Sequence, residues 1–395
     1  MQVTWIQKKL SNMNNSIKQK NIPSNWIQGP IEDFIIDIKD GGTPSRGKPE
    51  YFGGGIPWVV IKDIKPKIFS TNETLSQLGV ENSSAKVFPA GTVILSFGAT
   101  IGEVGIAEVD LATKQGISGV LPDIKKMETK YLYFLLQSQK KLLNQMATGS
   151  TIKEIRPNVI KKINVLVPPI PEQNKIVDIL SSVDEEVERN KLLIKRYEDL
   201  KIGILTDFLN SKTEKNKFRR KKLEDLCNFT TGKLNSNKAV EGGEYPFFTC
   251  SKETYAIDQY SFDCEAILLA GNNAAGIYSV KHYKGKFDAY QRTYVITIKN
   301  EEELDYVFLK EILNTKLNLL KNMSLGSTTK FLTIKLLYNI EVNIPSITEQ
   351  KRIAKILLLA DQNIAGYKIL KEKFIELKKG LMSDLLNGKV RTIKI

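Results

Sequence analysis

Two long stretches of the chain carry apolar residues at alternating steps of three and four positions, the spacing of one face of a helix. The apolar positions of the first stretch are Ile176, Leu180, Val183, Val187, Ile194, Tyr197, Leu200, Ile204 and Phe208. Those of the second are Ile353, Leu357, Ala360, Ile364, Tyr367, Leu370, Phe374, Leu377, Leu381 and Leu385. This pattern is typical of a coiled-coil seam, and Asn190 interrupts the first seam where a polar residue often fixes the register. It predicts two helices of about 38 residues, roughly 55 Å each at 1.5 Å per residue.

The two stretches are copies of one sequence pattern. An offset of 177 residues takes Glu172 to Glu349 without a gap. The same offset pairs Gln173 with Gln350, Ile176 with Ile353, Asp184 with Asp361, Gly203 with Gly380, Asp207 with Asp384, Asn210 with Asn387, and Gly149-Ser150-Thr151 with Gly326-Ser327-Thr328. Solenoid repeats have periods of about 20–50 residues. The chain therefore reads as two copies of a domain that ends in a long helix.

The helix ends carry local signals. Pro171 is tolerated in a first turn, Thr348 is expected to cap the second helix, and Gly388 is expected to end it. Because each helix is reached from its own globular segment, we expect the two helices to pair with each other, antiparallel. Packing of each helix on its own domain is the alternative.

The globular segments repeat the same order of elements. In the first half we expect strands at 56–61, 92–97 and 163–167 and a helix at 128–146. In the second half we expect strands at 266–271 and 340–344 and a helix at 304–321. The polar, basic segment 211–222 separates the halves, as a linker, a phosphate contact or both. The predicted parts are an N-terminal extension at 1–25, a globular domain at 26–168, a long helix at 169–212, a second globular domain at 213–345, and a second long helix with its tail at 346–395.

Composition narrows the class of protein. A chain of 395 residues is long enough for about two or three domains. Its formal net charge of +14 favours a polyanionic partner, and nucleic acid is the commonest one, although a lysine-rich solvated surface is the alternative. Cys227, Cys250 and Cys264 match no zinc spacing and read as thiols of a reducing cytoplasm. No apolar run approaches the roughly 20 residues of a membrane helix, and the N-terminal segment lacks the apolar core of a signal peptide.

The sequence matches none of the catalytic motifs that we considered. The single histidine, His282, excludes most zinc chemistry and most Ser–His or Cys–His catalysis. The run 53–55 (GGG) has the wrong spacing for a dinucleotide fingerprint, and no nucleotide-binding P-loop sequence occurs. The run 167–170 (VPPI) lacks the leading Asn or Asp and the aromatic residue of an adenine methyltransferase signature. Pro122-Asp123 with Glu128 and Lys130 is too cramped for a nuclease metal site, and a structural or partner-docking role is expected for Asp207 and Asp384.

A series of motifs resembles a known family. The first half carries GGTPSR (41–46), GGGIPWV (53–59), SFGATIGEVGIA (96–107), Gln115 and GSTIKEIRPNVIKKINVLVPPIPEQNKI (149–176). The second half carries GSTTKFLTIKLLYNIEVNIPSITEQKRI (326–353). These motifs are similar to those of the DNA specificity subunit of Type I restriction–modification systems, over about 26–387. The second copy departs from the pattern at Ser346 and Thr348, where the first copy has Pro169 and Pro171, and residues 1–25 have no counterpart.

The resemblance implies an α/β (α+β) fold: two target-recognition domains joined by two long antiparallel helices, with an internal pseudo-two-fold repeat. It implies that each domain reads one half of a split DNA site, while the helices set the spacing. The implied partners are double-stranded DNA, two modification (methyltransferase) subunits and the restriction (motor–nuclease) subunits, in the cytoplasm. No cofactor is expected on this chain, since S-adenosylmethionine belongs on the modification subunit.

Candidate DNA contacts are polar side chains near the loops. Arg and Lys pair with guanine edges, and Asn and Gln pair with adenine edges. In the first domain the candidates are Thr43, Ser45, Arg46, Lys48, Lys62, Thr100, Gln115, Ser118 and Lys153. In the second they are Lys233, Asn235, Lys252, Asn272, Asn273, Tyr290, Gln291, Arg292 and Lys330. Lys153 and Lys330 follow the Gly-Ser-Thr segments, which fit a backbone nest for phosphate and, equally, a turn before a strand.

Two other classes of function remain. One is an enzyme, a DNA methyltransferase or nuclease of unfamiliar type, which would modify or cut DNA alone. The other is a structural coiled-coil adaptor, which would bind no DNA even with its partners present. The missing cofactor and metal motifs argue against the first, and the doubled domain with its charge argues against the second.

Overall fold

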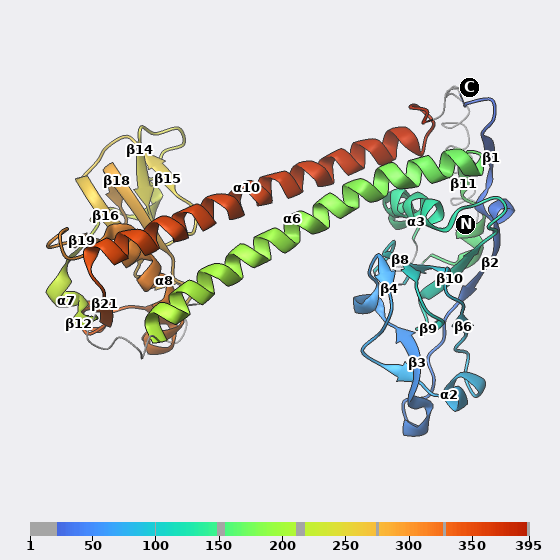
Figure 1. The fold of residues 1–395 in the computed structure, drawn as a ribbon, viewed down its shortest axis with the longest axis horizontal. Helices are drawn as coiled ribbons and strands as arrows, with labels where there is room; N and C mark the ends of the chain where they lie inside the picture. The colour runs from blue at the N-terminus through green and yellow to red at the C-terminus, as the bar shows by residue number, and fades with distance from the viewer. Residues whose placement is uncertain are drawn as a thin grey trace. The chain divides into compact units, whose positions relative to one another are not determined.

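A computed structural model describes residues 22–98, 100–147, 155–210, 218–273, 276–326 and 329–392, without the side chains of 207–210. Backbone contacts divide the chain into two units. The first unit comprises the chain up to Arg189 together with Lys371 onward, and the second comprises Asn190–Leu370. Each unit therefore holds one globular domain, the start of one long helix and the end of the other (Figure 1).

The first unit is built on two sheets and a strand pair. The five-stranded sheet has the order β2-β10-β7-β8-β4, from Ile35–Asp40, Ile117–Pro122, Val93–Ser96, Val104–Ala107 and Lys67–Ile68. The four-stranded sheet has the order β5-β3-β9-β6, from Thr74–Leu75, Phe52–Val59, Leu111–Thr113 and Val87–Phe88. The remaining pair joins β1 (Ile27–Pro30) to β11 (Asn164–Val167). The expected strands at 56–61, 92–97 and 163–167 are thus confirmed as β3, β7 and β11.

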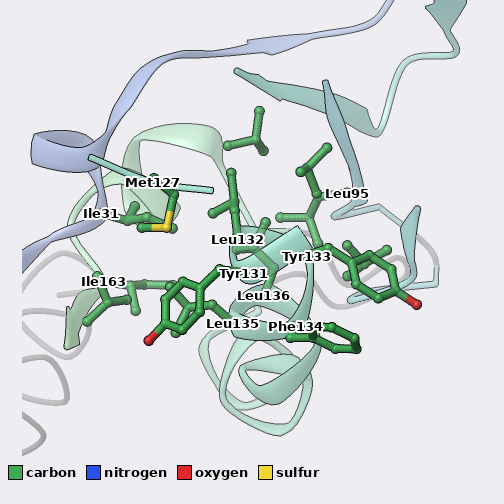
Figure 2. Packing of buried hydrophobic residues seen from close by; sticks show 14 of the residues in the cluster. Ile31, Leu95, Met127, Tyr131, Leu132, Tyr133, Phe134, Leu135, Leu136 and Ile163 are labelled. Atoms are coloured by element: carbon green, nitrogen blue, oxygen red, sulfur yellow. The ribbon is translucent and has the colours of Figure 1, made fainter. Parts of the chain in front are cut away.

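One helix supplies much of the first core. The expected helix at 128–146 is present but breaks at Gln139 into α3 (Thr129–Ser138) and α4 (Lys140–Met146). Residues 131–136 of α3 are all buried, and they pack with Ile31, Leu95, Met127 and Ile163 (Figure 2). Short helices η1 (Ile31–Phe34), η2 (Pro49–Tyr51), η3 (Ile61–Asp63), α2 (Gln77–Glu81) and α5 (Pro157–Lys161) lie in the connections.

The second unit repeats the scheme with a larger sheet. Its six strands have the order β13-β19-β16-β18-β14-β15, from Cys227–Thr231, Thr293–Ile298, Phe262–Ala270, Val280–Ala289, Tyr245–Phe248 and Tyr255–Ile257. The pairs β12–β21 and β17–β20 come from Arg219–Lys222 with Glu341–Ile344 and from Asn272–Asn273 with Lys330–Phe331. The helices are α7 (Leu223–Leu226), η4 (Ser236–Lys238), α8 (Tyr306–Met323) and α9 (Ile334–Tyr338). The expected helix at 304–321 and the strands at 266–271 and 340–344 are confirmed as α8, β16 and β21.

The two sheets share a central order. Strands β2-β10-β7-β8 of the first unit correspond to β13-β19-β16-β18 of the second. In the first unit β8 and β9 are separate strands, and β9 runs parallel to β3. In the second unit the single strand β18 pairs with β16 and also runs parallel to β14. The first unit therefore has two separate sheets at this place, whereas the uninterrupted strand β18 joins the corresponding strands of the second unit into one sheet.

The long helices are α6 (Ile170–Asn210) and α10 (Ile347–Leu385), as the apolar periodicity predicts. The predicted cap at Thr348 is wrong, because α10 begins one residue earlier and the hydroxyl of Ser346 accepts the Glu349 N–H at 3.4 Å. Gly388 follows α10 with a φ of 66°, and its N–H reaches the carbonyl of Leu385 at 3.2 Å, which confirms the expected stop.

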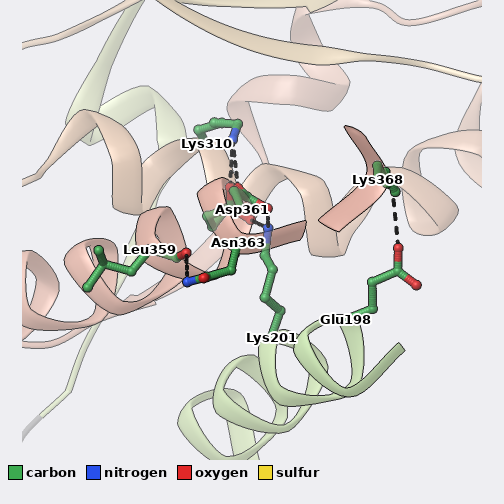
Figure 3. A network of polar contacts seen from close by, with 8 residues as sticks. Glu198, Lys201, Lys310, Leu359, Asp361, Asn363 and Lys368 are labelled. Carbon is green, nitrogen blue, oxygen red and sulfur yellow. Dashed lines mark hydrogen bonds and ion pairs between the residues drawn. The ribbon is translucent and has the colours of Figure 1, made fainter. Parts of the chain in front are cut away.

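The helices run antiparallel within each unit. In the first unit, Asp184 of α6 contacts Lys378 of α10, whereas Glu172, earlier in α6, contacts Arg391, just beyond α10. In the second unit Tyr197 stacks on Tyr367, with ring centroids 5.9 Å apart. One turn later Lys201 pairs with Asp361 (Figure 3). The expected antiparallel pairing is confirmed, and each helix also packs on its own domain.

The apolar seam is only partly buried. Its ends are covered by the two domain cores, which take Ile176 and Leu180 in the first unit and Ile353 and Leu357 in the second. The polar seam residue Asn190 is buried as well. However, Leu200, Leu370 and Leu377 are 47%, 43% and 49% exposed, so these positions of the seam are covered only in part.

Candidate nucleic-acid interface

The first domain brings a tight turn against its glycine-rich loop. Strand β9 ends at Thr113, and the following turn is closed by a hydrogen bond of 3.0 Å from the Ile117 N–H to the Lys114 carbonyl. The loop after β2 is bonded to this turn, since the N–H of Gly41 donates to Ile117 and that of Gly42 donates to Thr113, at 3.0 and 2.9 Å. Gln115, at the tip of the turn, is exposed.

Glycine is required where the loop meets the strand. A Cβ atom on Gly41 would lie 2.2 Å from the carbonyl oxygen of Thr113, closer than real Cβ contacts. The indole Nε1 of the fully buried Trp58 donates to the carbonyl of Gly42 at 3.1 Å. The strand end and the tryptophan therefore fix the point from which Thr43, Ser45, Arg46 and Lys48 emerge.

Arg46 is held in place by aromatic rings and a carboxylate. Its guanidinium lies 4.7 Å from the ring centroid of Phe52 and 5.1 Å from that of Trp58. Its Nη1 donates to Glu73 at 2.6 Å, and this hydrogen bond holds the pKa of Glu73 below its usual value. Lys48 donates to the hydroxyl of Tyr51 at 2.9 Å, a hydrogen bond that raises the pKa of Lys48. Two cations of the glycine-rich loop are thus pre-oriented yet exposed.

The second domain builds the same turn. Its closing hydrogen bond runs from the Thr293 N–H to the Tyr290 carbonyl at 2.8 Å. Tyr290 N–H donates to Phe248, the end of the strand that runs parallel to β18, just as Lys114 N–H donates to Val59 at the end of β3. Gln291 therefore occupies the position of Gln115 in an equivalent turn.

The glycine-rich loop is also repeated. A Cβ atom on Gly232 would lie 1.7 Å from the carbonyl oxygen of Ala289, which corresponds to the Gly41 contact in the first domain. The N–H of Gln291 donates to the carbonyl of Leu234 at 2.9 Å, and its side-chain Nε2 donates to Asn235 at 2.8 Å. Loop and turn are therefore joined in both units, although the side chains that they present differ.

A third segment meets the turn in each unit. The N–H of Gly98, after β7, donates to Gly116 at 3.1 Å, and that of Gly271, after β16, donates to Arg292 at 2.9 Å. Thr100 is exposed beyond the first of these glycines. In the second unit, Asn272 and Asn273 of β17 are half-buried and pair with Phe331 and with Lys330, itself half-buried.

The remaining candidates lie around these three segments or outside them. Lys62 follows β3, and Lys252 follows β14, two residues after Cys250, whose thiol donates to the carbonyl of Arg292 at 3.3 Å. Both lysines are exposed, as are Lys233 and Arg292, and Tyr290 is half-buried. Lys153 and the segments 149–151 and 327–328 lie outside the described residues.

One candidate is misplaced. Ser118 is fully buried in β10, between the neighbouring strands β2 and β7, so it does not reach the surface. Ser118 was chosen for its polar side chain, whereas strand β10 begins at Ile117 and takes Ser118 into the sheet.

Sequence reasoning also missed two exposed cations. Lys114 is the first residue of the Gln115 turn, and Lys238 ends the short helix η4 that follows Asn235. Their proximity in the sequence to the chosen glutamine and asparagine was the only available signal.

The acidic residues considered for catalysis have structural contacts. Glu128 caps α3 by accepting the Tyr131 N–H at 2.6 Å, and Asp384 pairs with Lys389 at 3.0 Å. Among the described residues, no cluster of three or more His, Cys, Asp or Glu side chains could hold a metal ion. No helix in the described part of the chain is long and apolar enough to cross a membrane.

Comparison with known proteins decides the family. The profile of the Type I restriction modification DNA specificity domain matches the chain twice, at residues 23–196 and 215–376. The chain belongs to this family. Each match runs from a globular domain into the long helix that follows it, so the 177-residue repeat is a repeat of the specificity domain.

Among curated relatives, the Type I restriction enzyme MjaIX specificity subunit of Methanocaldococcus jannaschii is 33% identical over 43% of this chain and 40% of its own length. The Type I restriction enzyme EcoDI specificity subunit of Escherichia coli is 41% identical over 34% of this chain and 29% of its own length. The chain thus aligns with less than half the length of these two relatives. The MjaVIII specificity subunit of M. jannaschii is matched over 94% of both chains at 22% identity.

Solved structures from Type I restriction–modification systems have a similar fold. The crystal structure of a Type I restriction–modification S subunit from M. genitalium superposes with a TM-score of 0.67 and 20% identity, covering 93% of this chain and 97% of that one. A chain from a structural study of Type I complex assembly superposes with a TM-score of 0.57 and 18% identity. These structures support the two-domain, two-helix architecture of the specificity family.

Proposed function

We propose that this chain is the DNA specificity subunit of a Type I restriction–modification complex, and that each unit reads one half of a split double-stranded DNA site. The observation that carries the proposal is the doubled interface. A glutamine turn, a glycine-locked loop and the segment after the central strand are bonded together in both units. The frame is repeated while its side chains differ, which is what two readers of different half-sites require.

The chemistry of the exposed side chains fits base and phosphate contacts. Gln115 and Gln291 carry the amide group that pairs with both N6 and N7 of adenine, and Arg46 carries the fork that pairs with O6 and N7 of guanine. The basic chain, with a formal net charge of +14, neutralises phosphates and makes the affinity fall as salt rises. Loops in the major groove would supply sequence choice, and lysines such as Lys48 would supply position.

The antiparallel helix pair is proposed to set the distance between the half-sites. Half-site centres at least one turn of DNA apart, about 34–36 Å, suit a helix pair of this length. Inserting matched helical repeats into α6 and α10 should change the spacer and leave both half-site sequences unchanged. A change of half-site sequence instead would contradict this role of the helices.

The uncovered apolar positions of the helices are proposed to dock two modification subunits. Leu192 and its repeat partner Ile369 are 50% and 58% exposed. Leu200 and its repeat partner Leu377 are 47% and 49% exposed. Matched exposure at repeat-related positions supports this proposal, because two copies of one partner require two equivalent docking sites.

The chemistry of the complex is proposed to lie on its other subunits. S-adenosylmethionine would bind the modification subunits, and the restriction subunits would supply the motor and nuclease. The chain itself would be non-catalytic and would act in the cytoplasm, where the genome is.

Selection of bound sequences from a random DNA library tests the proposal. The chain would be purified with its modification subunit, and the bound DNA sequenced. We expect two short enriched sequences at one fixed separation. A matched pair of variants, Gln115→Ala and Gln291→Ala, should each alter a different half. Enrichment of no sequence by an intact complex would favour a structural adaptor, and modification or cutting of DNA by the chain alone would favour an enzyme.

A further inference from the structure

Gln173 and Gln350 occupy the same position in the two long helices, and both are fully buried. In the first unit, Gln173 Oε1 accepts the N–H of Glu128 at 2.8 Å. Its Nε2 donates to the carbonyls of Lys126 and Pro168, both at 2.8 Å. Both amide hydrogens and the amide oxygen are therefore used, which fixes the orientation of the amide group.

The second unit repeats all three hydrogen bonds. Gln350 Oε1 accepts the N–H of Asp305 at 3.0 Å. Its Nε2 donates to the carbonyls of Glu303 and Pro345, at 2.8 and 3.0 Å. Every partner is the residue that the 177-residue offset predicts, although the side chains of two of the three partners differ. The contact therefore depends on the glutamine and on the backbone, and not on the identity of the partner residues.

The backbone that each glutamine holds leads into the main helix of its recognition domain. The amide pairs with an N–H and a carbonyl two residues apart, as a neighbouring β-strand would. The residue between them is buried in the domain core, as Met127 in the first unit and Leu304 in the second. The next residue caps the domain helix, since Glu128 accepts the Tyr131 N–H at 2.6 Å and Asp305 accepts the Phe308 N–H at 2.9 Å.

Apolar contacts alone leave the angle between helix and domain loosely defined. Ile176 and Leu180 pack into the first core, as Ile353 and Leu357 do into the second. Burial of apolar surface is non-directional, so it tolerates small rotations of a helix on its domain. Three hydrogen bonds from one rigid amide are directional and resist such a rotation.

We propose that Gln173 and Gln350 are positioning residues that fix the angle at which each recognition domain is mounted on its long helix, and thereby restrict the specificity subunit to one spacer length between half-sites. This role rests on the proposed function. It predicts that the attachment of one recognition domain to its long helix, here called the mount, can be loosened without altering which bases that domain reads.

The test uses the full chain co-expressed with its modification subunit, with methylated positions mapped across a whole genome. Gln173→Met and Gln350→Met keep the side-chain volume and remove the hydrogen bonds. We expect both variants to methylate the wild-type half-sites and also sites whose spacer is one base pair longer or shorter. Discrimination against such spacers should fall by about tenfold, the factor for a free-energy difference near 1.4 kcal/mol. If a methionine variant does not fold, Gln173→Asn and Gln350→Asn retain an amide that is too short to reach the domain backbone.

Hydrogen exchange provides a readout without DNA. The Glu128 amide in the Gln173 variant, and the Asp305 amide in the Gln350 variant, should exchange at least about tenfold faster, while the Leu132 and Leu309 amides inside α3 and α8 stay protected. The matched control is Leu95→Ala, which weakens the first core and leaves the three hydrogen bonds of Gln173 in place.

Three outcomes separate the possibilities. Relaxed spacers in the glutamine variants, with a single spacer in the Leu95→Ala control, support the role. A single unchanged spacer in all variants overturns it and leaves a purely structural glutamine. A wild-type complex that methylates no bipartite motif contradicts the proposed function instead, and the exchange rates then decide whether the amides fix the mount.

Discussion

The ammonium group of Lys378 lies 2.7 Å from the carboxylate of Asp184, and the 177-residue offset turns this pair into Asp361 with Lys201. In each unit the aspartate of one helix thus pairs with the lysine of the other helix, so the contact is repeated along with the sequence. The surroundings differ. Lys201 and Asp361 join Lys310 and the buried Glu311 in an ionic network, whereas Lys378 lies 5.0 Å from the ring centroid of Phe134, which holds the position of Glu311.

The Asp184–Lys378 pair should couple the two helices in the first unit. Either single variant, Asp184→Ala or Lys378→Ala, should lower the urea midpoint, and the exchanged pair Asp184→Lys with Lys378→Asp should recover part of the loss. A double-mutant cycle should give a coupling of about 1 kcal/mol, because Lys378 is only 14% exposed. All three tryptophans lie at or before residue 58, so tryptophan fluorescence reports unfolding of the first unit. The exposed Glu198–Lys368 pair provides the comparison, and its coupling is measured by hydrogen exchange. An equally small coupling for Asp184–Lys378 would contradict the expectation.

Glu172 should make the first unit sensitive to acid. Burial alone raises its pKa, but hydrogen bonds from Arg391 and from the Trp26 indole hold the pKa below its ordinary value of 4.5. A carboxylate with a lowered folded pKa stabilises the protein above its unfolded pKa, and this contribution disappears as the pH falls through the folded pKa. The free energy of unfolding should therefore decrease as the pH drops below about 4.5. Glu172→Gln should make this decrease with pH less steep.

The equivalent residue of the second unit provides the control. Glu349 is half-buried, with 40% of its side chain exposed, and pairs with Arg352 on its own helix, at 2.7 Å. Glu349→Gln should leave the acid profile of tryptophan fluorescence unchanged. Equal effects of the two variants would mean that the buried pair of Glu172 with Arg391 does not set the profile.

The turn glutamines should govern different half-sites. Gln115→Ala should relax the choice of base in one half-site by about 1–3 kcal/mol, and Gln291→Ala should do the same in the other, because a bidentate pair contributes on this scale. Ser118→Ala is the matched control, since the buried hydroxyl reaches no surface and should leave recognition unchanged. Competition binding with single-base variants of each half-site measures both effects. A loss spread equally over both half-sites would contradict the assignment.

Arg46 and Lys48 should act in different ways on DNA. Lys48→Ala should weaken binding to all sequences and reduce the slope of log affinity against log salt by about 1, as loss of one phosphate contact does. Arg46→Lys keeps the charge but loses the planar fork, so it should lower affinity for the cognate site while leaving non-specific binding nearly unchanged. Binding titrations at several salt concentrations, on cognate and unrelated DNA, separate the two behaviours. The same salt slope in wild type and Lys48→Ala would place Lys48 away from the phosphates.

The sequence predicts the two long helices and the two repeated units because each leaves a periodic or repeated pattern of residues. The steps of three and four locate α6 and α10, and the repeated Glu-Gln pair aligns the two units. Periodicity identifies an apolar face but not how far it is covered, and Leu370 and Leu377 on that face are 43% and 49% exposed. The functional importance of that exposure rests on partners that the chain does not contain.

The candidate interface was predictable only in part. Gln115 and Gln291 were chosen for their chemistry, and the structure places them in equivalent turns. Two of the three partners of Gln173 lie 45 and 47 residues away in the sequence, so no local pattern could reveal these hydrogen bonds. Ser118 was wrongly predicted to contact DNA. It lies buried in a strand between two other strands, and its polar side chain alone does not distinguish it from a loop residue.

Genome-wide mapping of methylated bases, with this chain and its modification subunit expressed together in cells, tests the central claim most directly. The account predicts one split motif, with two different half-sites at a fixed spacer and methylation on both strands. Exchanging the segment 26–168 for that of a relative should change one half-site only. A continuous motif, or a stable complex that leaves the genome unmethylated, would contradict the claim that the two units read two halves of one DNA site.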